Sequence, residues 1–286
     1  MTSAPRTGKH RLLATSDLHV TYQENREFVA AIHPESSDDW LIVAGDVGEK
    51  FHDIEWALSL LRSRFRTVLW SPGNHELWTT KDDAVQARGE MRYKQLVEMC
   101  RSIDVLTPED PYPVFEGSGG PVVVAPLFTL YDYTFRPDGT TGQESALAKA
   151  HAAGVVCTDE YFLHPDPYPS REAWCAARIA ETERRLGEID ESLPTVLVNH
   201  YPLVREPTRI LRYPEFALWC GTEATADWHL RFRAVEMVYG HLHVPRTTRH
   251  DGVRFDEVSL GYPREWKPRG WTKTQLHDVL REGDAR

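Results

Sequence analysis

Short apolar runs, each followed directly by a polar residue able to bind a metal ion, most constrain how this chain can fold. Three runs lie in the first quarter of the sequence, at 11–15, 39–44 and 67–70, and amphipathic stretches separate them. Two further runs, at 195–198 and 235–239, continue the pattern in the second half. Nearly continuous apolar runs that alternate with stretches of helical spacing are typical of βαβ units, whose sheets are covered on both faces. We therefore expect an α/β fold.

The polar residues that end these runs carry oxygen or nitrogen ligand atoms and include no thiolate. Because the carboxyl ends of the strands in an α/β sheet face one crevice, we expect these side chains to converge. Seven such groups are too many for one tetrahedral ion, but they suit two ions that share a bridging carboxylate. Glycines at 45, 73 and 240 would let the backbone turn tightly beside the ions. The candidate ligands are Asp17, His19, Asp46, Asn74, His200, His241 and His243.

Composition restricts the class of protein and of partner. The 286 residues carry a formal charge of −10, and strong nonspecific binding to nucleic acid or anionic membrane would require clustered Lys and Arg instead. The four cysteines are scattered and form no CxxC pair, which argues against a disulfide framework and a cysteine zinc site. No apolar run approaches the ~20 residues of a membrane span, and the first residues lack a signal-peptide pattern. We expect a soluble cytoplasmic protein with neither a membrane nor a nucleic-acid partner.

Two insertions interrupt the pattern of runs. Residues 127–193 are rich in aromatic residues and prolines and end in an amphipathic helix, and residues 206–229 are irregular. Long insertions in compact folds are usually functional or disordered, and the aromatic content argues against disorder. We expect both insertions to form a cap over one edge of the sheet, within a single domain that spans residues 1–286. Arg209 and Arg212 in the second insertion are candidate substrate contacts.

The order of the motifs resembles that of the calcineurin-like metallophosphoesterases. The residues that carry the resemblance are DLH at 17–19, GD at 45–46, GNHE at 73–76, NH at 199–200 and GHLH at 240–243. This resemblance implies a four-layer α/β/β/α sandwich with two mixed β-sheets. It also implies hydrolysis of a phosphate ester by hydroxide that two divalent metal ions activate. Mn or Fe are the expected ions, with Zn or Ni as alternatives, because nitrogen and oxygen ligand sets accept several metals.

The resemblance also distributes the ligands between the two ions, with Asp46 as the bridge. The first ion would be held by Asp17, His19, Asp46 and His243. The second would be held by Asp46, Asn74, His200 and His241.

His75 is the expected general acid, because its neighbour Asn74 is a candidate ligand and would hold it beside the ions. Asn74 and His75 are also expected to contact the substrate. In the family a carboxylate three residues after the bridging aspartate often orients this histidine; here it is Glu49, and Glu76 is the competing candidate. Lys50 stands where an arginine is common, so it either contacts phosphate as a point charge or faces water.

Three functions are compatible with these motifs. The aromatic insertions, the acidic charge and the lack of a basic stripe favour a phosphatase that hydrolyses a phosphomonoester of a small metabolite in a closed pocket. The alternative is a phosphodiesterase or nuclease with the same metal centre, in which aromatic residues stack on bases. A catalytically inactive metal-binding scaffold is disfavoured, because every ligand position is present. The candidate stacking residues are Tyr131, Tyr133, Phe135 and Trp219.

Overall fold

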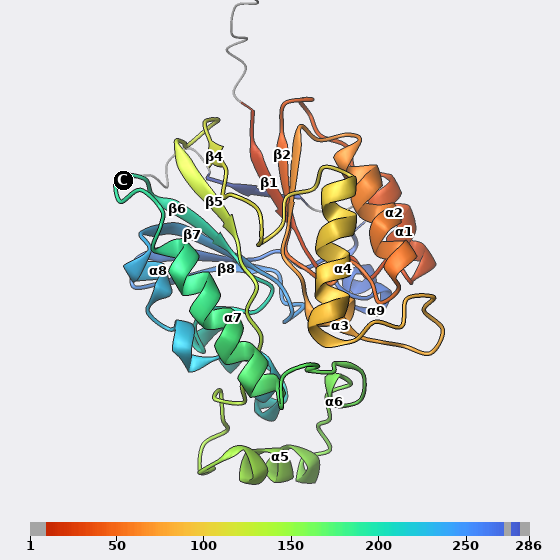
Figure 1. Cartoon of the computed structure of the whole chain (residues 1–286), viewed down its shortest axis with the longest axis vertical. Coiled ribbons are helices and arrows are strands. Elements are labelled where there is room, and N and C mark those ends of the chain that lie inside the picture. Colours follow the sequence, from red (N-terminus) through yellow and green to blue (C-terminus); the bar gives the residue numbers. More distant parts are fainter. Residues whose placement is uncertain (1–9, 272–275, 281–286) are drawn as a thin grey trace, which may run out of the picture.

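Two mixed β-sheets pack face to face at the centre of the molecule, and helices cover their outer faces (Figure 1). The computed structural model describes residues 10–271 and 276–280. This is the four-layer α/β/β/α sandwich that the resemblance to the calcineurin-like metallophosphoesterases implies. In the described part of the chain, no helix has both the length and the apolar character that crossing a membrane requires.

The first sheet contains the three apolar runs of the N-terminal part of the chain. Its spatial order is β10 (His277–Val279), β1 (Leu12–Thr15), β2 (Trp40–Val43) and β3 (Thr67–Trp70). The strands β1, β2 and β3 run parallel, and β10 runs antiparallel to β1 at the edge. The outer face is covered by α1 (Gln23–Ala30), α2 (Phe51–Arg62) and α4 (Gly89–Ser102).

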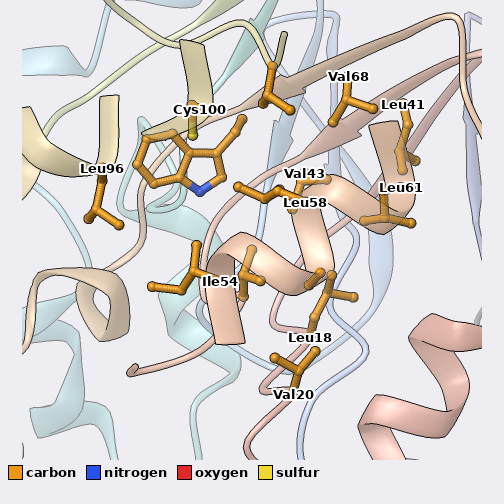
Figure 2. Close-up of a cluster of buried hydrophobic side chains, with 14 of the residues drawn as sticks. Leu18, Val20, Leu41, Val43, Ile54, Leu58, Leu61, Val68, Leu96 and Cys100 are labelled. Atoms are coloured by element: carbon orange, nitrogen blue, oxygen red, sulfur yellow. The ribbon is translucent and has the colours of Figure 1, made fainter. Parts of the chain in front are cut away.

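Helix α2 illustrates why the sequence forms a covering helix. Its residues Ile54, Leu58 and Leu61 recur at spacings of four and three, which places them on one face of a helix. That face packs on Val43 of β2 and Val68 of β3, and all five side chains are buried (Figure 2). The packing fixes the sheet on which the first candidate ligands are mounted.

The second sheet is larger and comes mostly from the second half of the chain. Its spatial order is β4 (Val114–Phe115), β5 (Val122–Pro126), β6 (Thr195–Val198), β7 (Ala234–Tyr239), β9 (Val253–Glu257) and β8 (Arg246–His250). The four central strands run parallel, and β4 and β8 pair antiparallel at the edges. Its outer face is covered by α7 (Arg171–Leu186) and α8 (Trp228–Arg231).

The core between the sheets is made of small aliphatic side chains from both. Ala14 and Ile42 of the first sheet pack in one buried cluster with Val124, Val196 and Val238 of the second. The side chains that follow the parallel strands of both sheets meet in shared clusters, so these strands end at the same side of the molecule.

The cap is smaller than the two insertions predicted from the sequence. Helix α7 lies inside the first insertion, yet Leu186 belongs to the core of the second sheet, so this helix is a covering helix. Residues 127–170 lie below the strand ends in Figure 1. We call residues 127–170 and 206–219 together the cap segment. Its elements are α5 (Gln143–Ala152), α6 (Asp159–Phe162), η1 (Glu206–Ile210) and η2 (Pro214–Trp219).

The four candidate stacking residues of the cap segment are buried and do not present free faces. Tyr131, Tyr133 and Trp219 pack with Ala146 and Ala150 of α5 in one buried cluster. Phe135 is also buried, against the second sheet. The suggestion that these four aromatic residues stack on bases is therefore wrong, because each is almost fully covered by protein.

Candidate metal centre

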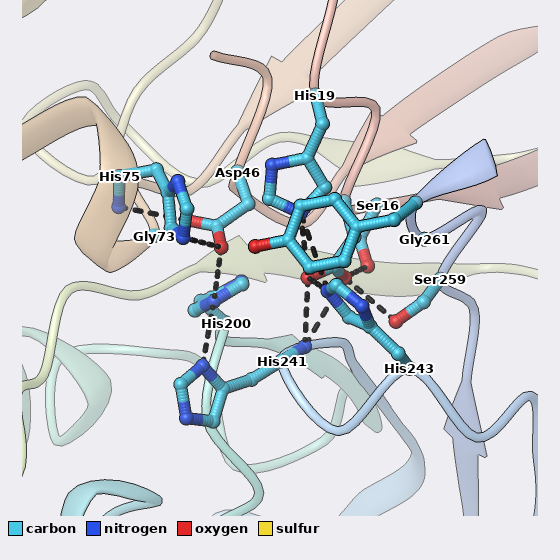
Figure 3. A network of polar contacts seen from close by, with 12 residues as sticks. Ser16, His19, Asp46, Gly73, His75, His200, His241, His243, Ser259 and Gly261 are labelled. Carbon is cyan, nitrogen blue, oxygen red and sulfur yellow. Dashed lines mark hydrogen bonds and ion pairs between the residues drawn. The ribbon is translucent and has the colours of Figure 1, made fainter. Parts of the chain in front are cut away.

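All seven candidate ligands converge between the ends of the two sheets. Asp17, His19, Asp46 and Asn74 follow the strands of the first sheet, and His200, His241 and His243 follow β6 and β7 of the second. Figure 3 shows the imidazole rings and the Asp46 carboxylate directed at one another across the seam. This convergence of residues that are far apart in the sequence is what strand-end placement predicts.

Asp17, His19 and His243 form the first group of ligand atoms. Asp17 Oδ1 lies 3.0 Å from His243 Nε2, and the Nε2 atoms of the two histidines face each other at 3.2 Å. A single proton placed between two such nitrogens satisfies both only in part, whereas a cation bound by both would use both lone pairs. The group therefore has the donor chemistry of a divalent metal site.

Asn74, His200 and His241 form the second group. His200 Nδ1 donates to the carbonyl oxygen of Ala44 at 2.9 Å, so its Nε2 carries the lone pair that faces the centre. This Nε2 lies 3.2 Å from both Asn74 Oδ1 and His241 Nδ1. Three ligand atoms thus point at one small volume.

Asp46 lies between the two groups. Its Oδ2 is 3.4 Å from His200 Nε2. Ligand atoms of Asp46, His19 and His75 lie within 4.8 Å of one another, and so do those of Asp46, His200 and His241. Although burial opposes charging of His200, the negative charge of Asp46 raises the pKa of that histidine to about 10. Positive charge is therefore stabilised beside Asp46, whereas burial lowers the pKa of His19 and of His241 to about 3 and keeps these two imidazoles neutral, the form that binds a metal ion.

The backbone at these ligands is strained. Asp17, His19, Asp46, His241 and His243 all have positive φ angles, between 41° and 69°. Such left-handed conformations cost roughly 1–3 kcal/mol each in residues other than glycine, and they cluster at functional sites. Five of the seven candidate ligands share this strain, which aims successive side chains from tight loops into one centre.

Three glycines allow the strand-end loops to approach one another closely. Gly45 has φ of 90°, and a Cβ on it would lie 2.6 Å from the amide nitrogen of Gly73. A Cβ on Gly73 would overlap the Asp46 carboxylate, and a Cβ on Gly240 would overlap Ser16 and Asp17. Close approach, more than an unusual turn, is therefore the reason for glycine at positions 73 and 240.

His75 lies beside the centre, and Glu49 holds it. His75 Nδ1 donates to Glu49 Oε1 at 2.9 Å, while His75 Nε2 lies 3.7 Å from Asp46 Oδ2. Burial opposes charging of His75, but Asp46 and then Glu49 raise its pKa. Burial likewise opposes charging of Glu49, but its hydrogen bond with His75 lowers the pKa of this carboxyl to about 2. Both shifts favour a protonated imidazole, which is the form that a general acid needs.

Glu76 has a different task from Glu49. Its carboxylate accepts hydrogen bonds from the amide nitrogens of Asp46 and Val47 at 2.9 Å and of Gly73 at 3.0 Å. Burial, reinforced by the charge of Asp46, raises the pKa of Glu76 to about 7. Of the two carboxylates considered for orienting His75, the geometry thus favours Glu49, and Glu76 joins the loops after β2 and β3.

Further residues of the centre lie outside the sequence motifs. Glu265 accepts from His243 Nδ1 at 2.6 Å, and Asp159 accepts from Asn74 Nδ2 at 2.9 Å. Tyr262 stacks on His19 with ring centroids 4.4 Å apart. Two of these residues, Glu265 and Tyr262, belong to the loop and short helix α9 (Pro263–Trp266). No local pattern marks these residues, because each acts through a contact with a distant strand end.

A cleft of about 920 Å³ connects the centre to the cap segment. Asp46, Asn74 and His75 form its inner end, whereas Val156 and Tyr213 of the cap segment belong to its outer wall. The cleft is further lined by Trp78, Asp159, Arg212, Phe216, Tyr262 and Arg264.

The three basic residues expected to contact substrate differ in position. Arg212 lines the cleft, with its guanidinium 5.5 Å from the ring centroid of Tyr213. Arg209 and Lys50 are not among the described residues that line it. Arg209 is exposed beside Glu206. Lys50, the residue before helix α2, pairs through Nζ with Asp82 at 2.6 Å.

Comparison with known proteins agrees with the fold. The model of the calcineurin-like phosphoesterase family matches residues 10–245. The chain is 54% identical over 270 residues, 93% of its length and 83% of the relative's, to the [acyl-carrier-protein] phosphodiesterase PptH of Mycobacterium tuberculosis. The crystal structure of phosphopantetheinyl hydrolase (PptH) from the same organism has 52% sequence identity and a TM-score of 0.94, covering 97% of this chain and 98% of that one. The chain therefore belongs to the calcineurin-like phosphoesterases and is a hydrolase of phosphoric esters.

Proposed function

We propose that this protein is a metal-dependent phosphodiesterase that hydrolyses the phosphodiester between a phosphopantetheinyl group and an acyl carrier protein. The observation that carries this proposal is the 54% identity, over 93% of the chain, to a relative named for that class of substrate. It replaces the small phosphomonoester that we expected from composition. The comparison favours the phosphodiesterase alternative, and the substrate becomes protein-linked instead of a free metabolite.

The seven converging side chains would hold two divalent cations, with Asp46 between them. Mn or Fe is proposed first and Zn or Ni second, because the donors are carboxylate, amide and imidazole groups without thiolate. When bound, such cations lower the pKa of water toward neutrality and stabilise charge on the phosphoryl oxygens. The geometry supports this proposal, since His19 Nε2 faces His243 Nε2 at 3.2 Å and His241 Nδ1 faces His200 Nε2 at 3.2 Å, so that each pair of nitrogens can offer its lone pairs to one cation.

His75 supplies the proton that the leaving group requires. Its Nδ1–H is held by Glu49, so Nε2 faces the inner end of the cleft. In the proposed reaction, water gives up one proton to the solvent as its oxygen forms a bond to phosphorus, and the P–O bond to the carrier protein breaks. Protonated His75 Nε2 gives its proton to the departing oxygen, which leaves the carrier protein with a free hydroxyl and releases phosphopantetheine.

The cleft suits a substrate that is long and attached to a protein. Its volume of about 920 Å³ extends from the candidate ligands to the cap segment. Val156 and Tyr213 at its outer wall are 62% and 52% exposed, so apolar side chains are presented where a carrier protein would approach. Arg212 in the same wall can pair with phosphate through its planar guanidinium.

Mass spectrometry of the carrier protein tests the proposal directly. The purified protein is incubated with Mn²⁺ and a phosphopantetheinylated carrier protein, and we expect the carrier protein to lose the mass of the prosthetic group. Metal chelation should abolish the loss, and elemental analysis of the purified protein identifies the resident metal. Hydrolysis of p-nitrophenyl phosphate, with no action on bis(p-nitrophenyl) phosphate or on the carrier protein, would restore the phosphomonoesterase reading.

A further inference from the structure

We infer that Asp159, a residue of the cap segment, is a positioning residue that orients both the candidate ligand Asn74 and the candidate acid His75. The inference rests on the metal centre put forward under the proposed function, but it does not depend on the identity of the substrate. It gives the cap segment a part in the chemistry, in addition to forming a wall of the cleft.

One oxygen of Asp159 accepts two hydrogen bonds from the strand-end side of the cleft. Asn74 Nδ2 donates to Asp159 Oδ1 at 2.9 Å, and Trp78 Nε1 donates to the same oxygen at 2.7 Å. An asparagine amide has an oxygen end and a nitrogen end that can exchange places by rotation. Because the nitrogen end is bound to Asp159, the oxygen end faces His200 Nε2 at 3.2 Å, where a cation would need it.

The second hydrogen bond acts on His75 through Trp78. The indole of Trp78 stacks on the imidazole of His75, with ring centroids 3.8 Å apart and planes inclined by 28°. Asp159 fixes the rotation of the indole by holding its N–H. His75 is therefore fixed by two carboxylates, directly at Nδ1 by Glu49 and through a stacked ring by Asp159.

The Asp159 carboxylate is buried, which costs free energy of folding. The residue is 0% exposed, and its second oxygen, Oδ2, has no hydrogen-bond partner among the described residues. A buried carboxylate with incomplete hydrogen bonding lowers stability. A neutral residue would hold α6 in place at a lower cost in stability. The side chain of Asp159 instead binds Asn74 and Trp78, which indicates that its task is to orient them.

The cap segment is tied to the centre at this point by its backbone as well. The amide nitrogen of Thr79 donates to the carbonyl oxygen of Phe162 at 3.1 Å, and Trp78 forms an isolated antiparallel bridge with Leu163. Asp159 is the first residue of α6, so these backbone contacts help to hold its carboxylate next to Asn74. A movement of the cap segment would therefore shift Asn74 directly, through its hydrogen bond to Asp159.

Titration of the metal-stripped protein with Mn²⁺ tests whether Asp159 orients Asn74. We expect Asp159→Ala to weaken binding at one of the two sites by about 10–100-fold, the usual effect of removing a group that orients a ligand, and to leave the other site unchanged. Asp159→Asn keeps an acceptor oxygen in place, so it should restore most of the affinity. Unchanged affinity at both sites in Asp159→Ala would overturn this role.

The nature of the leaving group tests whether Asp159 orients His75. An alkyl leaving group needs a proton from a general acid, whereas p-nitrophenolate departs without one. We expect Asp159→Ala and Trp78→Phe to lower the rate on an alkyl diester more than on bis(p-nitrophenyl) phosphate. Trp78→Phe should leave the Mn²⁺ affinities unchanged. Equal losses on both substrates in both variants would remove His75 from the inference.

Glu160→Gln is the matched control. Glu160 is the neighbouring carboxylate on α6, and its hydrogen-bond partners are Tyr133, Arg171 and Trp219, none of which is a candidate ligand. This variant should loosen the cap segment without changing either metal affinity or the alkyl-to-aryl ratio. The same losses in Glu160→Gln as in Asp159→Ala would reduce Asp159 to general support of the cap segment. Wild-type protein that binds two Mn²⁺ ions but spares the carrier protein would refute the proposed substrate and leave the role of Asp159 standing.

Discussion

The strand-end loops and the cap segment line the same cleft, yet they are held in different ways. The loops are buried, strained in backbone conformation and pinned by hydrogen bonds such as those from three amides to Glu76. The cap segment has a small aromatic core of its own and leaves Val156 and Tyr213 exposed at the rim. The difference indicates a division of labour. Under the proposed function, the loops would hold the catalytic groups, the cap segment would contact the carrier protein, and Asp159 would connect the two.

The largest expected effect comes from the carboxylate that both groups of loop ligands share. We expect Asp46→Asn to reduce kcat/KM on a diester by more than about 10³-fold, because the change affects both cation sites, whereas loss of an orienting residue typically gives 10–100-fold. Elemental analysis should find less metal in the variant. Asp53→Asn, which changes a buried carboxylate of α2 that pairs with Arg26 and is not a candidate ligand, is the control that should retain both properties. Full metal content and activity in Asp46→Asn would mean that the centre is misread.

The next effect separates the acid from the ligands. His75→Ala should lower kcat on an alkyl diester by about 10²–10⁴-fold, the usual contribution of a general acid, and far less on bis(p-nitrophenyl) phosphate. Metal content should stay at the wild-type level, since His75 is not one of the seven candidate ligands. An equal loss on both substrates would argue against His75 as the proton donor.

Two glutamates in the loops should give opposite results. Glu49→Gln should lower the alkyl-diester rate by about 10–100-fold. It should also move the alkaline limb of the pH–rate profile to lower pH, because the charge of Glu49 raises the pKa of His75 and activity is lost as pH rises through that pKa.

Glu76→Ala should instead lower the free energy of unfolding by about 3 kcal/mol or more, because three buried amides lose their acceptor and each costs roughly 1–3 kcal/mol. Thermal unfolding measures this change. If Glu49→Gln lowered the melting temperature as much as Glu76→Ala, the distinction between the two carboxylates would fail.

The smallest effect belongs to the rim of the cap segment. Tyr213→Ala should raise KM for the carrier protein several-fold, on the order of the 1–2 kcal/mol that an exposed aromatic contact contributes to binding. It should leave kcat/KM on bis(p-nitrophenyl) phosphate unchanged, because the small substrate needs the inner end of the cleft alone. A matching loss on the small substrate would show that the cap segment and the loops are not separable.

The candidate ligands could be predicted from the sequence because a strand end is a local signal. An apolar run followed by Gly45-Asp46 or Gly73-Asn74 specifies both the strand and the edge of the sheet where the side chain emerges. The residues that support the ligands have no such signal. Asp159 contacts Asn74 across 85 positions of the chain, and Glu265 reaches His243 from a loop after the last strand of the second sheet.

The cap and the substrate were harder to predict for physical reasons. Helix α7 has the same amphipathic pattern whether it covers a sheet or belongs to an insertion, so its place depends on the apolar face it meets. The net charge of −10 averages over the whole surface and does not report on one wall of the cleft. Aromatic residues such as Tyr131 and Trp219 were equally compatible with a stacking surface and with the buried core that they form.

The placement of the ligands at the seam between the sheets has a mechanical consequence. Asp17, Asp46 and Asn74 are attached to the first sheet, whereas His200 and His241 are attached to the second. A cation bound by both sets would be a crosslink between the two halves of the sandwich, comparable in effect to a covalent bridge that the chain can open by losing an ion. Resistance to forced or thermal separation of the halves would then vary with metal supply, so the same ions would govern both turnover and the lifetime of the folded protein.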